Sequence, residues 1–238
     1  MDRVAFKRNP GIPKEGGIKM RVIELNRSIT DSNDRDADKL REIMKQKKIL
    51  MFNLMSSPGS GKTTLLSRVI KDIGSDFNIG VMEADIASDV DAVRIEALGA
   101  RAIQAHTDGM CHMDAGMTKR ALEAMGDEDL NLIFLENVGN LICPAEFDTG
   151  SGKNIMILSV PEGDDKPLKY PLMFEKSDAL IVTKMDTKEY FDFDTEKCIQ
   201  RVKKINPDIE IFFVSALNGD GMKDFYDWIK KSYEKWCE

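Results

Sequence analysis

A run of small residues followed by lysine and threonine has the most evident chemistry in this sequence. Residues 56–63 read Ser-Ser-Pro-Gly-Ser-Gly-Lys-Thr, between an apolar run at 49–55 and a helix-forming run at 64–73. Strand, glycine turn and helix together predict a phosphate-binding loop, whose backbone N–H groups point at phosphate oxygens near the positive helix end. A flexible linker is the alternative, but linkers do not join a buried strand to a helix. The residues expected to bind nucleotide here are Pro58, Gly59, Ser60, Gly61, Lys62, Thr63 and Thr64.

Two side chains of this loop and two later acids predict catalysis on a bound triphosphate. Lys62 is expected to reach the terminal phosphates, and the Thr63 hydroxyl to bind Mg²⁺. Glu136 follows a second apolar run and can hold Mg²⁺ or its water, while Gly139 can offer its N–H to the γ-phosphate. Asp85 follows another apolar run and is expected near the same Mg²⁺. The alternatives are a charged strand end for Glu136 and a helix cap for Asp85.

A later loop predicts which base is bound. Residues 183–186 read Thr-Lys-Met-Asp and resemble the guanine-reading motif of GTPases, Asn-Lys-x-Asp, with Thr183 in the place of asparagine. A buried Asp186 would accept from N1–H and the 2-amino group of guanine, and adenine would leave it unpaired. The stem of Lys184 can lie along the base, and an ordinary strand-to-helix turn is the alternative. Support comes from a resemblance of Ser215, Ala216 and Leu217 to the loop that binds guanine O6.

Three residues predict a second metal site. His112, one of two histidines in the chain, directly follows Cys111, and Cys143 lies four residues beyond Gly139. Thiolate and imidazole suit Zn²⁺ and Ni²⁺, but a closed structural zinc site takes four ligands. Solvent would then complete the site, or two chains would share it across a dimer interface. The spacing equally allows two small buried cysteines, with His112 capping a helix that starts near Asp114.

The surrounding pattern predicts an α/β fold that positions these loops. Apolar runs alternate with stretches of helical spacing, which indicates a mostly parallel sheet covered on both faces by helices. Ligands of such sheets bind beyond the carboxyl ends of the strands, where the candidate residues lie. Strands are expected at 49–55, 79–82, 132–135, 155–160, 179–182 and 211–214, with a further weak strand at 20–25. Helices are expected at 34–48, 64–73, 90–98, 115–125, 195–205 and 222–233.

The length fits one domain. With the motifs above, we expect residues 1–33 to be a flexible N-terminal extension and 34–238 to be a P-loop GTPase domain with an inserted metal site. A net charge of −7 and a pI near 5.1 argue against a nucleic-acid-binding protein. No run approaches the roughly 18 apolar residues that cross a bilayer, and the start does not resemble a signal sequence. A soluble cytoplasmic protein without a membrane partner is expected. Its four cysteines show no disulfide framework.

These features together resemble the HypB family of nickel-incorporation GTPases in hydrogenase maturation, within the P-loop GTPases that assist metallocentre assembly. The resemblance covers about residues 30–236, and serine at position 56 is usual in that family. The most specific stretches read NLMSSPGSGKTT at 53–64, ENVGNLICPA at 136–145 and SVPEGDDKPLKYP at 159–171.

The resemblance implies Mg²⁺-assisted GTP hydrolysis and a homodimer favoured by GTP. It implies a Ni²⁺ or Zn²⁺ site built from Cys111, His112 and Cys143 at the dimer interface. It also implies the zinc-containing accessory protein HypA as a partner, and nickel delivery to the large subunit of a nickel–iron hydrogenase. Two features depart from the family: residues 1–50 contain no Cys or His, which argues against nickel storage, and Thr183 replaces the usual asparagine.

Other functions stay open at this point. A small-molecule kinase would need a different base pocket. A zinc-stapled dimerisation module would bind GTP without delivering metal, and a urease-type nickel GTPase is an alternative within the wider group. The segment 162–171 would ordinarily be a solvated surface loop; in the family it lies near the nucleotide and the dimer contact, so Lys166 and Lys169 are candidates for contacts there.

Overall fold

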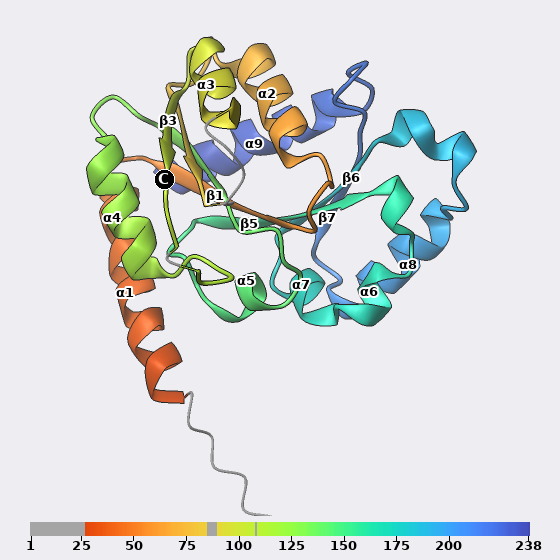
Figure 1. Cartoon of the computed structure of the whole chain (residues 1–238), viewed down its shortest axis with the longest axis horizontal. Helices are drawn as coiled ribbons and strands as arrows, with labels where there is room; N and C mark the ends of the chain where they lie inside the picture. Colours follow the sequence, from red (N-terminus) through yellow and green to blue (C-terminus); the bar gives the residue numbers. More distant parts are fainter. Residues whose placement is uncertain (1–26, 85–89, 108) are drawn as a thin grey trace, which may run out of the picture.

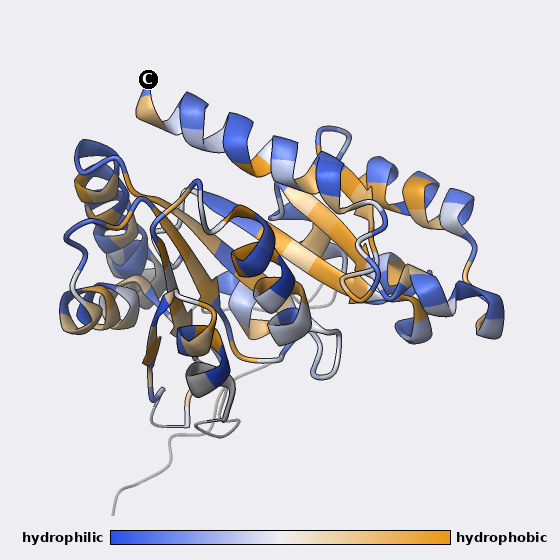
Figure 2. Ribbon diagram, turned by 90° about the horizontal axis from the view of Figure 1, so that it is seen from above, coloured by the Kyte–Doolittle hydropathy of each residue, from blue (hydrophilic) through white to orange (hydrophobic). Residues whose placement is uncertain are grey.

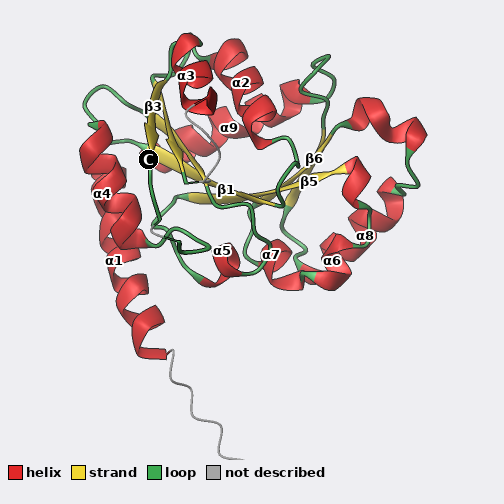
Figure 3. Cartoon of the chain, in the orientation of Figure 1, coloured by secondary structure: helices red, strands yellow, loops and turns green. Residues whose placement is uncertain are grey.

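A computed structural model describes residues 27–84, 90–107 and 109–238 of the chain. Its centre is a seven-stranded sheet in the order β3-β2-β4-β1-β5-β6-β7, and every neighbouring pair of strands is parallel (Figures 1 and 3). The strands are β1 (Leu50–Ser56), β2 (Ile79–Glu83), β3 (Arg101–Gln104), β4 (Leu132–Glu136), β5 (Lys153–Ser159), β6 (Ala179–Thr183) and β7 (Glu210–Phe213). The predicted α/β class and parallel sheet are confirmed.

The strands form where apolar residues fill both faces of the sheet. In β1 all seven residues are buried, because helices cover the strand on both sides. The six predicted core strands are present, each within two residues of its expected ends. The strand β3 was not predicted, because it reads Arg-Ala-Ile-Gln and only two apolar residues stand between a charged and a polar one.

Helices cover both faces of this sheet. The α-helices are α1 (Arg27–Gln46), α2 (Lys62–Ile73), α3 (Val90–Ala97), α4 (Ala115–Met125), α5 (Cys143–Glu146), α6 (Lys166–Lys169), α7 (Pro171–Glu175), α8 (Thr195–Ile205) and α9 (Met222–Cys237). Two 3₁₀ helices, η1 (Val160–Glu162) and η2 (Met185–Tyr190), follow β5 and β6. All six predicted helices are present, although α1 and α9 are longer than expected.

Apolar side chains on alternate positions of the strands divide the core into two sides. On one side, Leu50, Phe52 and Leu54 of β1 pack with α2, α3 and α9. On the other side, Met51 packs with α1 and α4, and Met55 packs with α5, α7 and α8. Apolar strands lie at the centre and the hydrophilic faces of the helices lie outside (Figure 2). The sheet is therefore a rigid, covered platform for the loops at its edge.

The N-terminal helix α1 begins before the predicted boundary of the GTPase domain. It runs from Arg27 to Gln46, across the expected division at 33/34, so that division stays a prediction. Arg41 fixes α1 to the rest of the domain, because its guanidinium donates to both carboxylate oxygens of Asp148 over 2.7 and 2.8 Å. The weak strand predicted at 20–25 lies outside the described residues.

Across the described ranges, no helix has both the length and the apolar character needed to span a bilayer.

Candidate nucleotide and metal site

The phosphate loop joins β1 to α2 at the centre of the sheet. Gly59 and Gly61 have φ angles of 75° and 93°, which side chains with a Cβ rarely adopt, so glycine permits this tight turn. The hydroxyls of Ser57 and Ser60 are buried without a hydrogen-bond partner among the described atoms. Such hydroxyls suit phosphate oxygens, which accept hydrogen bonds in loops of this kind. The geometry thus fits a bound phosphate chain.

The catalytic candidates meet beside this loop. Lys62 begins α2 and its Nζ lies 4.0 Å from Oε1 of Glu136 at the end of β4, with both side chains at least 90% buried. The Thr63 hydroxyl donates to the same Oε1 over 3.4 Å. The sheet brings them together because β1 and β4 are neighbours. Asp85, the other predicted Mg²⁺ ligand, lies outside the described residues.

A further acid, Glu83, lies at the same edge and was missed by the sequence analysis. It ends β2, is 4% exposed, and is the register partner of Glu136. Its position as an acidic residue at the end of a buried strand could have predicted it as a site residue, as the same position did for Glu136. Hydroxyl and carboxylate oxygens are the ligands that Mg²⁺ prefers, so Thr63 and Glu136 fit the predicted ion.

The predicted base-reading loop is bound to the phosphate loop. Thr183, at the end of β6, donates from Oγ1 to the backbone oxygen of Ser60 over 2.7 Å. Lys184 has a left-handed φ of 61°, and its Nζ donates to the backbone oxygen of Gly59 over 2.7 Å. A non-glycine residue holds such a φ only where its surroundings impose it, which is common at functional sites.

The two predicted guanine loops also contact each other. The Ser215 hydroxyl donates to Oδ1 of Asp186 over 2.6 Å. Ser215 is buried, but Asp186 is exposed, so the prediction of a buried carboxylate is wrong; Ser215 fixes Asp186 at the open edge of the sheet instead. Ala216 packs on the apolar core, whereas Leu217 is 78% exposed. Backbone groups of this turn, and not the Leu217 side chain, are therefore suited to bind a base.

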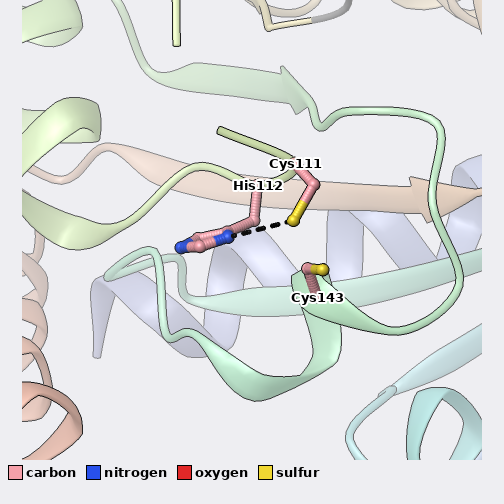
Figure 4. Close-up of side chains that lie close together, drawn as sticks. All are labelled: Cys111, His112 and Cys143. Carbon is pink, nitrogen blue, oxygen red and sulfur yellow. Dashed lines mark hydrogen bonds between the residues drawn. The ribbon is translucent and has the colours of Figure 1, made fainter. Parts of the chain in front are cut away.

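The three predicted metal ligands lie together on the other side of the phosphate loop. Cys111 and His112 are on the segment between β3 and α4, and Cys143 is the first residue of α5 (Figure 4). Their ligand atoms all lie within 4.8 Å of one another, and Cys111 Sγ is 3.8 Å from His112 Nδ1. Two sulfurs and one nitrogen at this separation form a donor set suited to Ni²⁺ or Zn²⁺.

The alternative interpretation of these residues does not match the structure. Cys111 is exposed and Cys143 is partly exposed, so they are not two buried hydrophobes. The α4 helix is capped by Asp114, whose carboxylate accepts from the Met117 N–H over 2.7 Å, and not by His112. His112 is buried instead, and its ring stacks on Phe147 with centroids 3.8 Å apart. This stacking fixes the plane of the imidazole.

The surroundings of these ligands alter their protonation. Burial lowers the pKa of His112, and the nearby charges of Asp114 and Glu146 oppose that shift. The neutral imidazole is the form that binds metal. Hydrogen bonding with the Cys111 thiol and burial raise the pKa of Cys143. Metal binding therefore has to displace a thiol proton.

Asn140 positions Cys143 and was not predicted from the sequence as a site residue. Its side-chain oxygen accepts from the backbone N–H of Ile142 over 2.8 Å and of Cys143 over 3.4 Å, which forms the turn before α5. Its side-chain nitrogen lies 3.6 Å from Cys143 Sγ. An asparagine three residues before a cysteine is common in turns, so the sequence alone gave little signal.

The segment 162–171, for which a solvated surface loop was the ordinary alternative, contains helical turns and internal ion pairs. Pro167 is buried in α6. Lys166 Nζ lies 3.7 Å from Glu162, and Lys169 Nζ lies 2.6 Å from Asp165, so acids within the segment pair with both candidate lysines. Their predicted contacts to nucleotide or partner subunit stay predictions.

Comparisons with known proteins agree with this geometry. The family model described as CobW/HypB/UreG, nucleotide-binding domain, matches residues 50–213. The hydrogenase maturation factor HypB of Azotobacter chroococcum is 44% identical over 227 residues, which are 95% of this chain and 74% of the relative.

Two solved structures are similar to the whole fold. HypB from Helicobacter pylori in complex with nickel has a TM-score of 0.81 at 36% identity, covering 86% of this chain and 96% of that one. HypB from Archaeoglobus fulgidus has a TM-score of 0.80 at 35% identity, covering 85% of this chain and 99% of that one.

Proposed function

The chain belongs to the CobW/HypB/UreG family and, within it, to the hydrogenase maturation factors HypB, and from this premise we propose that it is a GTP-hydrolysing nickel metallochaperone. GTP and Mg²⁺ bind at the phosphate loop. Nickel, the cargo, binds to Cys111, His112 and Cys143. The nucleotide state sets the nickel affinity, and hydrolysis releases nickel for insertion into a nickel–iron hydrogenase.

One observation carries this proposal: a single loop connects the phosphate site to the metal site. It leaves β4 after Glu136, passes Gly139, and ends at Cys143 in α5. A γ-phosphate contact at Gly139 that moves this loop must also move a metal ligand. Coupling between such sites is typically about 1–3 kcal/mol, and it acts equally in both directions.

The residues around the phosphates support hydrolysis. In this proposal the Lys62 ammonium stabilises charge on the terminal phosphates, and the backbone N–H groups of the phosphate loop orient them. Thr63 and Glu136, with Asp85 from the sequence motif, hold Mg²⁺. Bound Mg²⁺ would neutralise the charge that develops on the transferred phosphoryl group.

The base-reading loops support GTP as the nucleotide. Asp186 is held by Ser215, and Thr183 and Lys184 fix the same loop to the phosphate loop. A preformed carboxylate at this position accepts two hydrogen bonds from guanine and none from adenine. The loss of such bonds is a strong ground for rejecting the wrong base.

The incomplete metal site supports a dimer. Cys111, His112 and Cys143 supply three ligand atoms per chain, so a second copy can complete the coordination. We propose that GTP favours this homodimer and that the accessory protein HypA takes part in the transfer. The recipient is the hydrogenase large subunit, in the cytoplasm.

The test is nickel affinity measured with GDP and with a non-hydrolysable GTP analogue. The proposal predicts affinities that differ by about 5- to 150-fold between the two nucleotides. Equal affinities would contradict it, because a ligand that is indifferent to two states cannot shift them. Parallel titration with ATP separates this function from a kinase, and turnover of GTP separates it from a module whose nucleotide is structural.

A further inference from the structure

Asn137 lies between the two segments that carry the metal ligands. It directly follows β4 and is completely buried. Its side-chain oxygen accepts a hydrogen bond from the backbone N–H of Met113 over 3.1 Å and another from the Val138 N–H over 2.9 Å. This one oxygen atom therefore binds the backbone N–H of Met113, which follows His112, and the backbone N–H of Val138, which precedes Gly139.

The side-chain nitrogen of Asn137 joins it to the sheet. It donates to Oδ1 of Asn53 over 3.0 Å, and Nδ2 of Asn53 donates to Oδ1 of Asn154 over 3.0 Å. Asn53 is in β1, the strand that leads into the phosphate loop, and Asn154 is in the neighbouring β5. These three amides form a network, buried at Asn53 and Asn137 and partly buried at Asn154, that is anchored to the strand leading into the phosphate loop.

The network lies where packing alone would favour apolar residues. Met51 and Met55 lie on the same face of β1 as Asn53, and both are buried in apolar clusters. A buried amide is tolerated when its polar groups are paired, and paired networks fix one arrangement of a core. What the network anchors here is the side-chain nitrogen of Asn137, which is bonded to Asn53 of β1.

The two ligand segments are joined to the nucleotide loop in different ways. Cys143 is on that loop itself, whereas Cys111 and His112 belong to the segment between β3 and α4. The Met113 N–H bond to Asn137 connects this second segment to the nucleotide loop, and Met113 packs in the same apolar cluster as Val138.

We propose that Asn137 is the positioning residue that transmits the nucleotide state to Cys111 and His112. This inference rests on the proposed function and deepens it. When the loop at Gly139 moves toward a γ-phosphate, the Val138 N–H moves and the shared oxygen turns with it. The Met113 N–H follows that oxygen, so both ligand segments move together.

The test compares three proteins: the wild type, Asn137→Ala, and Asn154→Ala as a control that breaks the same network at its far end. The measured quantity is the ratio of nickel affinities with the GTP analogue and with GDP. In Asn137→Ala the ratio is expected to fall to about twofold or less, from the wild-type value of about 5- to 150-fold. Asn154→Ala is expected to keep the wild-type ratio, although it also loses side-chain hydrogen bonds to Asn53, Ser151 and Lys176.

The rescue variant is Asn137→Asp, which keeps an acceptor oxygen for the Met113 N–H and is expected to restore part of the ratio. A wild-type ratio in folded Asn137→Ala, or an equal loss in Asn154→Ala, would overturn the inference. A ratio of one in the wild type would instead overturn the proposed function.

Hydrogen exchange at the Met113 amide of the wild type gives a second measurement that needs no variant to fold. Its protection is expected to differ between GDP and the GTP analogue. Identical protection with both nucleotides would contradict the transmission through Asn137.

Discussion

The Oγ1 atom of Thr183 donates a hydrogen bond to the backbone oxygen of Ser60 over 2.7 Å, which binds the base-reading loop to the phosphate loop. Both groups are buried, so this bond is not exchanged for one to water. The predicted base-reading loop and the phosphate loop are therefore parts of one hydrogen-bonded unit.

The first prediction concerns this bond. Thr183→Val removes the donor and leaves the buried Ser60 carbonyl without it, at a cost of about 1–3 kcal/mol. We expect GTP and GDP to bind about 5- to 100-fold more weakly, by the usual tenfold per 1.4 kcal/mol. Preference for guanine over adenine should stay, because Asp186 is intact. Isothermal titration with both bases checks this, and unchanged GDP affinity would contradict the role of Thr183.

The second prediction concerns the base itself. Asp186→Asn replaces a carboxylate oxygen with an amino donor, so it cannot accept both guanine donors. One of the two hydrogen bonds is lost and the other is no longer charge-assisted, at a combined cost of about 3 kcal/mol, which corresponds to about 100-fold in GTP affinity. Xanthine has a carbonyl where guanine has its amino group, so XTP is expected to bind the variant better than GTP does. Equal GTP affinity in variant and wild type would argue against guanine reading by Asp186.

The third prediction concerns the metal ligands. Cys111→Ala and Cys143→Ala each remove a metal ligand. Removal of a residue that only hydrogen-bonds to a ligand lowers metal affinity by about 10- to 100-fold, so each substitution should lower nickel affinity by more than this. GTP affinity in the absence of metal should be unchanged. Cys198→Ala is the matched control, because Cys198 is buried in α8, away from the cluster. Wild-type nickel affinity in both cluster variants would exclude this site.

The fourth prediction concerns thiol reactivity. Burial raises the pKa of Cys198 to about 12, so almost none of it is thiolate at neutral pH. We expect alkylating reagents to modify the exposed Cys111 at least about 100-fold faster than Cys198. Nickel should protect Cys111 and Cys143 and leave the Cys198 rate unchanged. Mass spectrometry of peptides after timed labelling measures each rate, and fast labelling of Cys198 in the folded protein would contradict the prediction.

The fifth prediction concerns the helix that carries the phosphate loop. In α2, burial acts to raise the pKa of Asp72, but hydrogen bonds from Arg68 and Tyr226 outweigh it and hold the pKa below its usual value. Because this pKa is lower in the folded than in the unfolded protein, the Asp72 carboxylate stabilises the fold at pH values above its unfolded pKa of about 3.9. This stabilisation is lost as the pH falls through the pKa of the folded protein.

Asp72→Asn should therefore lower the free energy of unfolding by about 1 kcal/mol at pH 7, and the difference from wild type should shrink below about pH 4. Denaturant titration across this pH range measures it. Asp227→Asn, in an exposed pair with Lys223, is the control and should change stability very little. A constant difference between Asp72→Asn and wild type at every pH would contradict the assigned charge interaction.

The sequence predicted those elements that local patterns determine. Runs buried on both faces predicted six strands, and helical spacing predicted the helices. The edge strand β3 gave no such pattern because water reaches it. The helical turns of the segment 162–171 were not predicted, because they depend on the burial of Pro167 and on ion pairs that composition does not reveal.

In the candidate site, too, the sequence predicted the residues that belong to local motifs and missed those that only the fold brings together. Motif spacing predicted Lys62 and Glu136, because each belongs to a short local pattern, whereas spacing left the cluster of Cys111, His112 and Cys143 open and the family resemblance implied it. Asn53 and Asn137 were not predicted as site residues. Their side chains are hydrogen-bonded, but they are 84 positions apart in the sequence, so no local pattern connects them. Their importance depends on strand register, which a single sequence does not display.

The central strand β1 separates two groups of candidate site residues. On one side of β1, β3 and β4 lead to the loops with Cys111, His112 and Cys143; on the other, β6 and β7 lead to Asp186 and Ser215. Substitutions around Cys111 and His112 can therefore accumulate on one half of the sheet without touching Asp186 or Ser215 on the other. On one scaffold, these two groups of side chains are free to vary separately.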